Sequence, residues 1–169
     1  MADDQPDIRP GETTLGFDPG AHTDATLRFI GRIHTPWQRG DCPKNVTSAR
    51  ERAAAEGGQF TVKLDEGFAP GLIGLEPGRG IFLIYWMHRA RRDLITQAPR
   101  HAQYARGTFS LRSPNRPNPL AMSAVTITSL DPETGEIGID AIDCFDGTPL
   151  VDIKPWTAGV DTPVPLAEG

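Results

Sequence analysis

The chain has 169 residues, a length that suits a single domain with one hydrophobic core. Its formal net charge of −5 argues against a protein that binds polyanions over its whole surface. The 18 glycines and 16 prolines favour many short strands and turns over long helices. The two cysteines and four histidines are scattered and lack the spacing of a zinc site, so no metal is expected.

The two ends of the chain are polar and rich in proline, glycine and acidic residues. No signal peptide is visible, and no apolar run reaches the roughly 18 residues that a membrane span needs. We therefore expect a cytoplasmic protein with reduced thiols that does not associate with a membrane. We predict a mobile arm at residues 1–24, a folded domain at 25–160 and a C-terminal tail at 161–169.

The first half of the folded region has three stretches that alternate or are continuously apolar, and they predict strands at residues 26–34, 59–64 and 80–88. Residues 47–56 have high helical propensity, with Thr47 or Ser48 as a possible N-cap. Residues 69–75 predict a turn-rich connection with a single helical turn.

The second half begins with a polar, basic stretch at residues 89–106, which we expect to form a surface loop. Apolar residues around 108–111 suggest a strand that precedes a proline-rich loop. Further alternating stretches predict strands at residues 122–130, 136–142 and 150–153. Five or six strands joined by short turns indicate a mainly β protein, built as a single small antiparallel β-barrel with short helical turns and long loops.

The most distinctive stretch is RSPNRPNP, from Arg112 to Pro119. Proline fixes its own φ and disfavours helical geometry in the residue before it, so a rigid, extended loop is expected. Arg112 and Arg116 offer planar, permanently charged donors that suit carboxylates, phosphates or carbonyls. The residue types by themselves fit a solvated surface loop equally well.

Two further motifs accompany this loop: IGRIHTPW at residues 30–37 and DCFDGTPLVDIKPW at residues 143–156. In composition, order and spacing the three motifs resemble the TsaA-like family, the tRNA threonylcarbamoyl-adenosine methyltransferases called TrmO. The resemblance covers residues 25–160. It implies a β-barrel homodimer that binds S-adenosylmethionine near the subunit interface. The implied reaction is methylation of the threonylcarbamoyl-modified adenosine beside the tRNA anticodon.

The resemblance also implies roles for individual residues. The implied cofactor-binding residues are Thr35, Pro36, Trp37, His88, Arg89, Arg112, Ser113, Met122, Asp143, Cys144, Phe145, Asp146 and Gly147. The implied catalytic residues are Arg112, Asn115 and Arg116, although Asn115 stands where the family more often has histidine. The implied substrate-binding residues are Arg91, Arg92, Arg116 and Lys154.

The basic residues also bear on the methyl acceptor. Residues 89–116 contain seven arginines and one acid, Asp93, and such a basic face is compatible with RNA. Longer members of the family carry a further C-terminal domain that helps to bind tRNA, and we expect this basic stretch to substitute for it. Two alternatives remain open: a non-catalytic module that binds an adenine nucleotide or RNA, and a methyltransferase that acts on another small molecule.

Two enzyme classes are disfavoured by what the motifs lack. No serine has an adjacent His–Asp pair, which argues against hydrolase chemistry. No glycine-rich GxGxxG turn or P-loop is present, which argues against a Rossmann-type methyltransferase.

Overall fold

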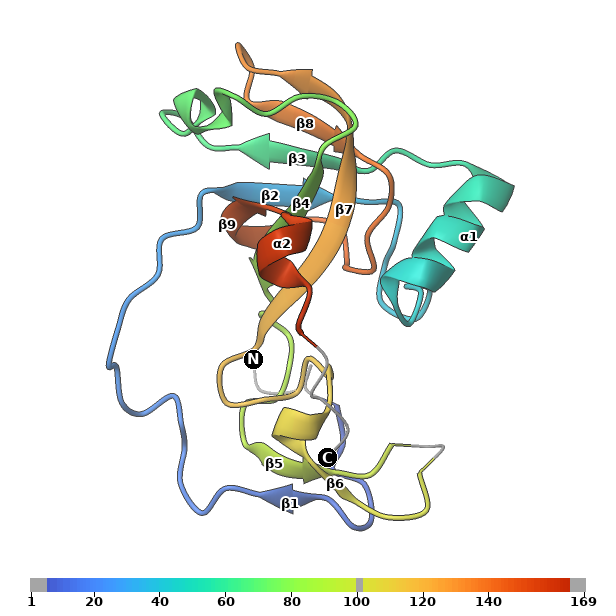
Figure 1. Cartoon of the computed structure of the whole chain (residues 1–169). Coiled ribbons are helices and arrows are strands. Elements are labelled where there is room, and N and C mark those ends of the chain that lie inside the picture. Colours follow the sequence, from blue (N-terminus) through green and yellow to red (C-terminus); the bar gives the residue numbers. More distant parts are fainter. Residues whose placement is uncertain (1–5, 100–101, 165–169) are drawn as a thin grey trace. The chain divides into compact units, whose positions relative to one another are not determined.

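β-Strands dominate the computed structural model, which describes residues 6–99 and 102–164 (Figure 1). Six strands form a closed barrel in the order β2-β3-β8-β7-β4-β9. Their bounds are Gly31–His34 (β2), Thr61–Leu64 (β3), Gly80–Trp86 (β4), Leu120–Asp131 (β7), Glu136–Ile139 (β8) and Thr148–Pro155 (β9). β2 pairs antiparallel with both β3 and β9, and β8 pairs antiparallel with β3 and β7. The predicted mainly β fold with an antiparallel barrel is confirmed.

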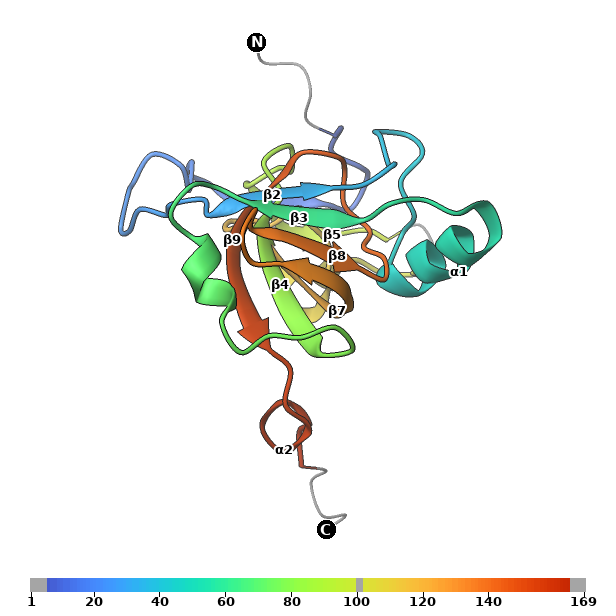
Figure 2. The same ribbon diagram turned by 90° about the horizontal axis from the view of Figure 1, so that it is seen from above.

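The barrel is closed by β9, which curves from β2 towards β4 (Figure 2). Its core follows the alternation read from the sequence. Ile33 of β2 and Ile81 and Leu83 of β4 are fully buried, whereas the intervening residues face outward or are half-buried. The alternation therefore sets which side chains fill the barrel.

The chain divides into two compact units, a division that the sequence did not predict. The barrel unit comprises residues 29–84 and 122–169, and the second unit comprises residues 1–28 and 85–121. The second unit contains a three-stranded sheet in the order β1-β5-β6. Its strands are Thr13–Thr14 (β1), Leu94–Gln97 (β5) and Arg106–Gly107 (β6), and they are followed by a short 3-10 helix, Thr108–Ser110 (η2).

This sheet corrects two expectations and bears on a third. Residues 89–106 are not one surface loop, because β5 lies within them and buries Leu94 and Gln97. Residues 108–110 form a 3-10 turn instead of a strand. The segment expected as a mobile arm contains β1, whose partner is β5, while residues 1–5 lie outside the described residues. Alternation cannot find such strands, since β1 and β6 have two residues each.

The helices agree more closely with the sequence. Helix α1 spans Val46–Glu56, and its N-cap is Asn45, whose side chain accepts a hydrogen bond from the Ser48 amide at 2.8 Å, so the predicted caps Thr47 and Ser48 are wrong. The predicted single helical turn is the 3-10 helix Ala69–Leu72 (η1). A second short helix, Ala158–Asp161 (α2), follows β9. In residues 6–99 and 102–164, no helix has both the length and the apolar character that crossing a membrane requires.

At Gly31, strand β2 lies so close to the backbone of its partner β3 that a side chain would not fit. A Cβ built at this position would overlap the main-chain carbonyl oxygen of Lys63 on the paired strand β3. Backbone of a paired strand cannot move aside as a flexible side chain can. We therefore expect Gly31→Ala to lower the free energy of unfolding by about 1–3 kcal/mol, measured by urea denaturation.

Gly159→Ala in α2 is the matched control, because no atom lies within 4 Å of a Cβ at that position. This control is expected to keep or slightly raise stability through the better helix propensity of alanine. Equal stability of Gly31→Ala and the wild type would contradict the close strand packing at β2.

Candidate functional site

The motif at residues 30–37 and the motif at residues 143–156 meet in the barrel unit, although they lie more than 100 residues apart in sequence. Thr35 is 8% exposed, and its Oγ1 donates a hydrogen bond to the Cys144 carbonyl at 2.9 Å and accepts one from the Trp37 amide at 3.1 Å. The Trp37 indole Nε1 donates to the Ile142 carbonyl at 2.8 Å. Side-chain donors of one motif therefore hold the backbone of the other.

The turn Asp143–Gly147 is itself held by main-chain bonds. The amides of Asp146 and Gly147 donate to the carbonyls of Trp37 and Ile33, each at 2.9 Å. The Phe145 carbonyl accepts the Thr148 hydroxyl at 2.6 Å. Gly147 has φ 74°, a conformation that other residues rarely adopt. The turn is thus preorganised by hydrogen bonds within the barrel unit.

These observations fit an adenine-reading turn, because rigid main-chain groups can match the donors and acceptors of a base edge. The Trp37 side chain is enclosed by residues of its own unit. Trp37 is buried and packs between Phe60, with ring centroids 5.5 Å apart, and the Arg52 guanidinium, 4.7 Å from its ring centroid. Cofactor contacts from Thr35, Pro36, Trp37 and residues 143–147 stay predictions.

A histidine–carboxylate pair lies beside this turn and was missed in the sequence. His34 Nδ1 is 3.1 Å from Asp146 Oδ1, and both side chains are partly exposed. Arg32, two residues earlier on β2, donates to the Gly147 carbonyl at 3.0 Å. Strand alternation predicts that Arg32 and His34 face outward, but no local signal links them to residues more than 110 positions away.

Neither cysteine is suited to act as a nucleophile. Burial, together with the nearby Asp143 carboxylate, raises the pKa of Cys42 to about 12. Burial likewise raises the pKa of Cys144, which is 1% exposed. Both thiols therefore stay protonated at neutral pH, and the thiolate needed for nucleophilic attack is absent.

The arginine loop, residues 112–119, lies in the second unit, and its two arginines are placed differently. Arg116 Nη2 donates to the carbonyls of Leu111 and Thr108 at 2.7 and 3.1 Å, and its own amide donates to the Arg91 carbonyl at 3.0 Å. Arg112 is exposed. The structure confirms that residues 112–119 contain no helix. Arg116 thus braces the residues that lead into its loop, and the Arg112 side chain is exposed to solvent.

Arg91 and Arg92, which were expected to bind the substrate, have partners within the second unit. Arg91 forms an ion pair with Asp93 at 2.7 Å and donates to the Pro6 carbonyl. Arg92 donates to the Pro117 carbonyl at 2.7 Å, and its guanidinium lies 5.8 Å from the Trp86 ring centroid. Substrate binding by Arg91 and Arg92 stays a prediction, although these contacts reduce their availability.

The remaining predicted residues are more accessible. His88, Arg89 and Met122 are exposed. The Asn115 side-chain Oδ1 accepts a hydrogen bond from the Arg91 main-chain amide at 3.1 Å. The Asn115 main-chain amide donates to Ser113 Oγ at 3.3 Å. Lys154 is exposed and pairs with Asp152 at 2.9 Å. The structure therefore gathers the predicted residues into two sets, one in each unit.

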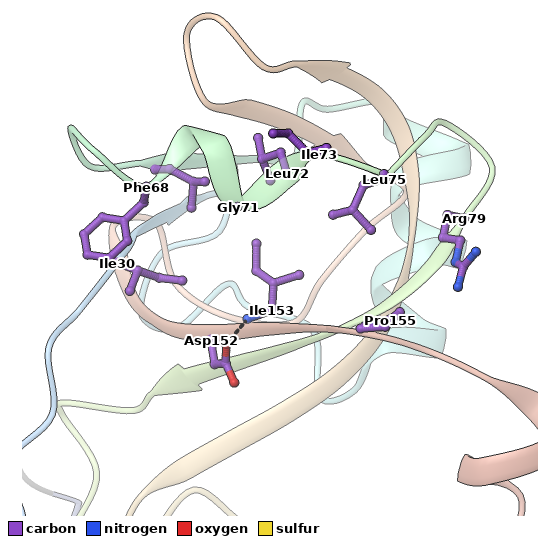
Figure 3. A pocket seen from close by; sticks show the side chains of 12 residues that line it. Ile30, Phe68, Gly71, Leu72, Ile73, Leu75, Arg79, Asp152, Ile153 and Pro155 are labelled. Carbon is purple, nitrogen blue, oxygen red and sulfur yellow. Dashed lines mark hydrogen bonds between the residues drawn. The ribbon is translucent and has the colours of Figure 1, made fainter.

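A separate pocket of about 410 Å³ lies in the barrel unit, between η1 with its following loop and the end of β9 (Figure 3). Apolar side chains line most of it, with Arg79 and Asp152 as its charged residues; the apolar ones include Phe68, Leu72, Ile73, Leu75, Ile153 and Pro155. None of the predicted cofactor-binding, catalytic or substrate-binding residues lines this pocket, although Ile30, Asp152, Ile153 and Pro155 belong to the motif stretches. Within residues 6–99 and 102–164, no cluster of three or more His, Cys, Asp or Glu side chains could hold a metal ion.

The barrel is closed, six-stranded and antiparallel, and the turn at residues 143–147 is bonded to the motif at residues 30–37. This architecture defines a class of β-barrel protein that is distinct from Rossmann-type enzymes. The model of the tRNA-methyltransferase O N-terminal domain matches residues 32–162. The chain belongs to this family.

Proteins of similar sequence are named as S-adenosyl-L-methionine-binding proteins or as a tRNA methyltransferase. The probable S-adenosyl-L-methionine-binding protein VirR of Rhizobium radiobacter is 37% identical over 133 residues, covering 78% of this chain and 71% of that protein. A probable S-adenosyl-L-methionine-binding protein of Methanothermobacter thermautotrophicus is 33% identical, covering 80% of this chain and 93% of its own. The mouse tRNA (adenine(37)-N6)-methyltransferase is 32% identical over 99 residues, which cover 57% of this chain and 22% of the mouse protein.

Solved structures agree with the fold. The crystal structure of TrmO from Pseudomonas aeruginosa superposes with a TM-score of 0.61 at 26% identity. The match covers 87% of this chain but 61% of the Pseudomonas chain. The chain thus spans less than two thirds of that protein.

The Arg91–Asp93 pair makes the second unit sensitive to acid. The Arg91 guanidinium holds the pKa of Asp93 below its usual value. Folding therefore favours the carboxylate, so its stabilising effect is present above about pH 4 and is lost as the pH falls through the lowered folded pKa. We expect Asp93→Asn to be less stable than the wild type at pH 7, with the difference shrinking below about pH 4. Thermal unfolding across pH measures this; a difference that stays constant down to pH 2 would contradict it.

Proposed function

We propose that this protein transfers a methyl group from S-adenosylmethionine to the N6 nitrogen of the threonylcarbamoyl-modified adenosine beside the tRNA anticodon. The observation that carries the proposal is membership in the tRNA-methyltransferase O N-terminal domain family. The mouse relative named tRNA (adenine(37)-N6)-methyltransferase supports the choice of tRNA and of this nitrogen. A cytoplasmic homodimer belongs to the same proposal, and light scattering would test the dimer.

In this proposal the protein's residues bind and orient, because the sulfonium of the bound cofactor is already an activated methyl donor. The turn Asp143–Gly147, held by Thr35 and Trp37, offers main-chain groups to the adenine edge. Arg112 offers a planar guanidinium to a carboxylate, either that of the cofactor's methionine part or that of the threonyl group of the acceptor. Arg116 ties the loop to the residues that precede it by donating to the carbonyls of Thr108 and Leu111. Holding two reactants in line in this way can supply much of the rate enhancement.

Arg112→Lys tests the ligand-binding role of the loop. Lysine keeps the positive charge but loses the planar fork, so we expect the affinity for S-adenosylhomocysteine to fall about tenfold. Isothermal titration calorimetry measures this. Arg106→Lys is the matched control, because Arg106 is also an exposed arginine of the second unit but lies outside the motif. Equal weakening by both substitutions would contradict a specific role for Arg112.

The methyl acceptor is tested in a deletion strain of the source organism. We expect its tRNA to lose the N6-methyl group from the threonylcarbamoyl-modified adenosine, as detected by mass spectrometry of tRNA nucleosides. A plasmid with the wild-type gene should restore the methyl group, and the Arg112→Lys gene should restore less of it. Unchanged tRNA nucleosides in the deletion strain would refute tRNA as the substrate. Cofactor binding without such a change would then leave the small-molecule methyltransferase and the non-catalytic module.

A further inference from the structure

Gln97 has a long polar side chain, and such residues are uncommon in buried positions. It ends β5 in the second unit and is 2% exposed. A buried amide is costly unless it is hydrogen-bonded. Gln97 Nε2 donates to the main-chain carbonyl of Asn115 at 2.6 Å and to Thr108 Oγ1 at 3.0 Å. The first of these bonds joins β5 directly to the middle of the arginine loop.

Thr108 completes the connection from the other side. It is fully buried, and its hydroxyl accepts from Gln97 and donates to the Leu94 carbonyl at 3.0 Å. Its own carbonyl accepts from Arg116 Nη2 at 3.1 Å. The hydroxyl thus fixes the direction of the Gln97 amide, because its one proton is directed to Leu94 and its lone pair is left for Gln97.

The composition of the loop explains why a side-chain donor matters here. Pro114, Pro117 and Pro119 have no N–H group, so the loop cannot be held by a regular ladder of main-chain hydrogen bonds. The carbonyls of the loop must therefore accept hydrogen bonds from side chains or from other segments of the chain. Gln97 supplies such a donor to the Asn115 carbonyl from a paired strand, β5, and Arg116 bonds the carbonyl of Leu111, just before the loop.

We propose that Gln97 is a positioning residue for the arginine loop: through the Asn115 carbonyl it sets the conformation from which Arg112 meets its ligand. Gln97 acts through the loop and does not touch the ligand. The proposal deepens the proposed function and rests on it for the identity of the ligand. The conformational part concerns the loop of the free protein and can be tested without any ligand.

Gln97→Met is the test, since methionine has a similar length but no donor. We expect amide hydrogen exchange at residues 111–116 to become about tenfold faster and the affinity for S-adenosylhomocysteine to fall about tenfold, in line with loss of one or two hydrogen bonds. Adding Arg112→Lys to Gln97→Met should weaken binding by less than the product of the single effects, because both act through one loop.

Ile137→Val is the control, because it removes one methylene from a fully buried residue of β8 in the barrel unit. It should lower the melting temperature while leaving loop exchange and cofactor affinity unchanged. If Gln97→Met shows the same pattern as Ile137→Val, the proposal is overturned. A wild type that binds no S-adenosylhomocysteine refutes the proposed function alone, since the exchange measurement still decides whether Gln97 orders the loop.

The Thr108 pair keeps the test decisive if Gln97→Met fails to fold. Thr108→Val removes the hydroxyl that orients the Gln97 amide and should raise loop exchange, whereas Thr108→Ser keeps the hydroxyl and should restore the wild-type rate. Equal exchange in Thr108→Val and Thr108→Ser would overturn the proposal.

Discussion

The protein depends on hydrogen bonds from side chains to main-chain carbonyls, because residues 35–37, 112–119 and 143–147 of its motifs lie outside regular secondary structure. In the barrel unit, Thr35 and Trp37 bond the carbonyls of Cys144 and Ile142. In the second unit, Gln97 and Arg116 bond carbonyls of residues 108–115. An unpaired buried carbonyl costs about as much as a lost hydrogen bond, so these donors decide whether either segment has one conformation.

This constraint divides the polar motif residues into two groups. Thr35, Trp37 and Arg116 are used internally, and their contribution to a ligand site is to hold backbone in place. Arg112 is exposed, and the backbone of residues 143–147 is held in one conformation by its hydrogen bonds to β2 and to residues 35–37. Rigid loops of this kind lose little conformational entropy when a ligand binds.

Much of the fold and part of the site could be predicted from the sequence. Alternation along β2 and β4 indicates barrel strands, since burial on one face imposes a period of two. The prolines of residues 112–119 exclude a helix locally. By contrast, the sheet β1-β5-β6 was missed because its strands are too short to show a period and its pairing is non-local. The sequence also suggested Arg91 and Arg92 as substrate-binding residues, without showing their partners Asp93 and Pro117.

The sequence alone determined the class of fold and the motif segments, because hydrophobic period, proline geometry and motif order are local or linear properties of the chain. Tertiary structure alone decided which arginine braces the loop and which faces solvent, that His34 meets Asp146, and that Gln97 reaches Asn115. These outcomes depend on the distance and direction between groups that are remote in sequence. Burial and hydrogen-bond geometry arise only when the elements have packed.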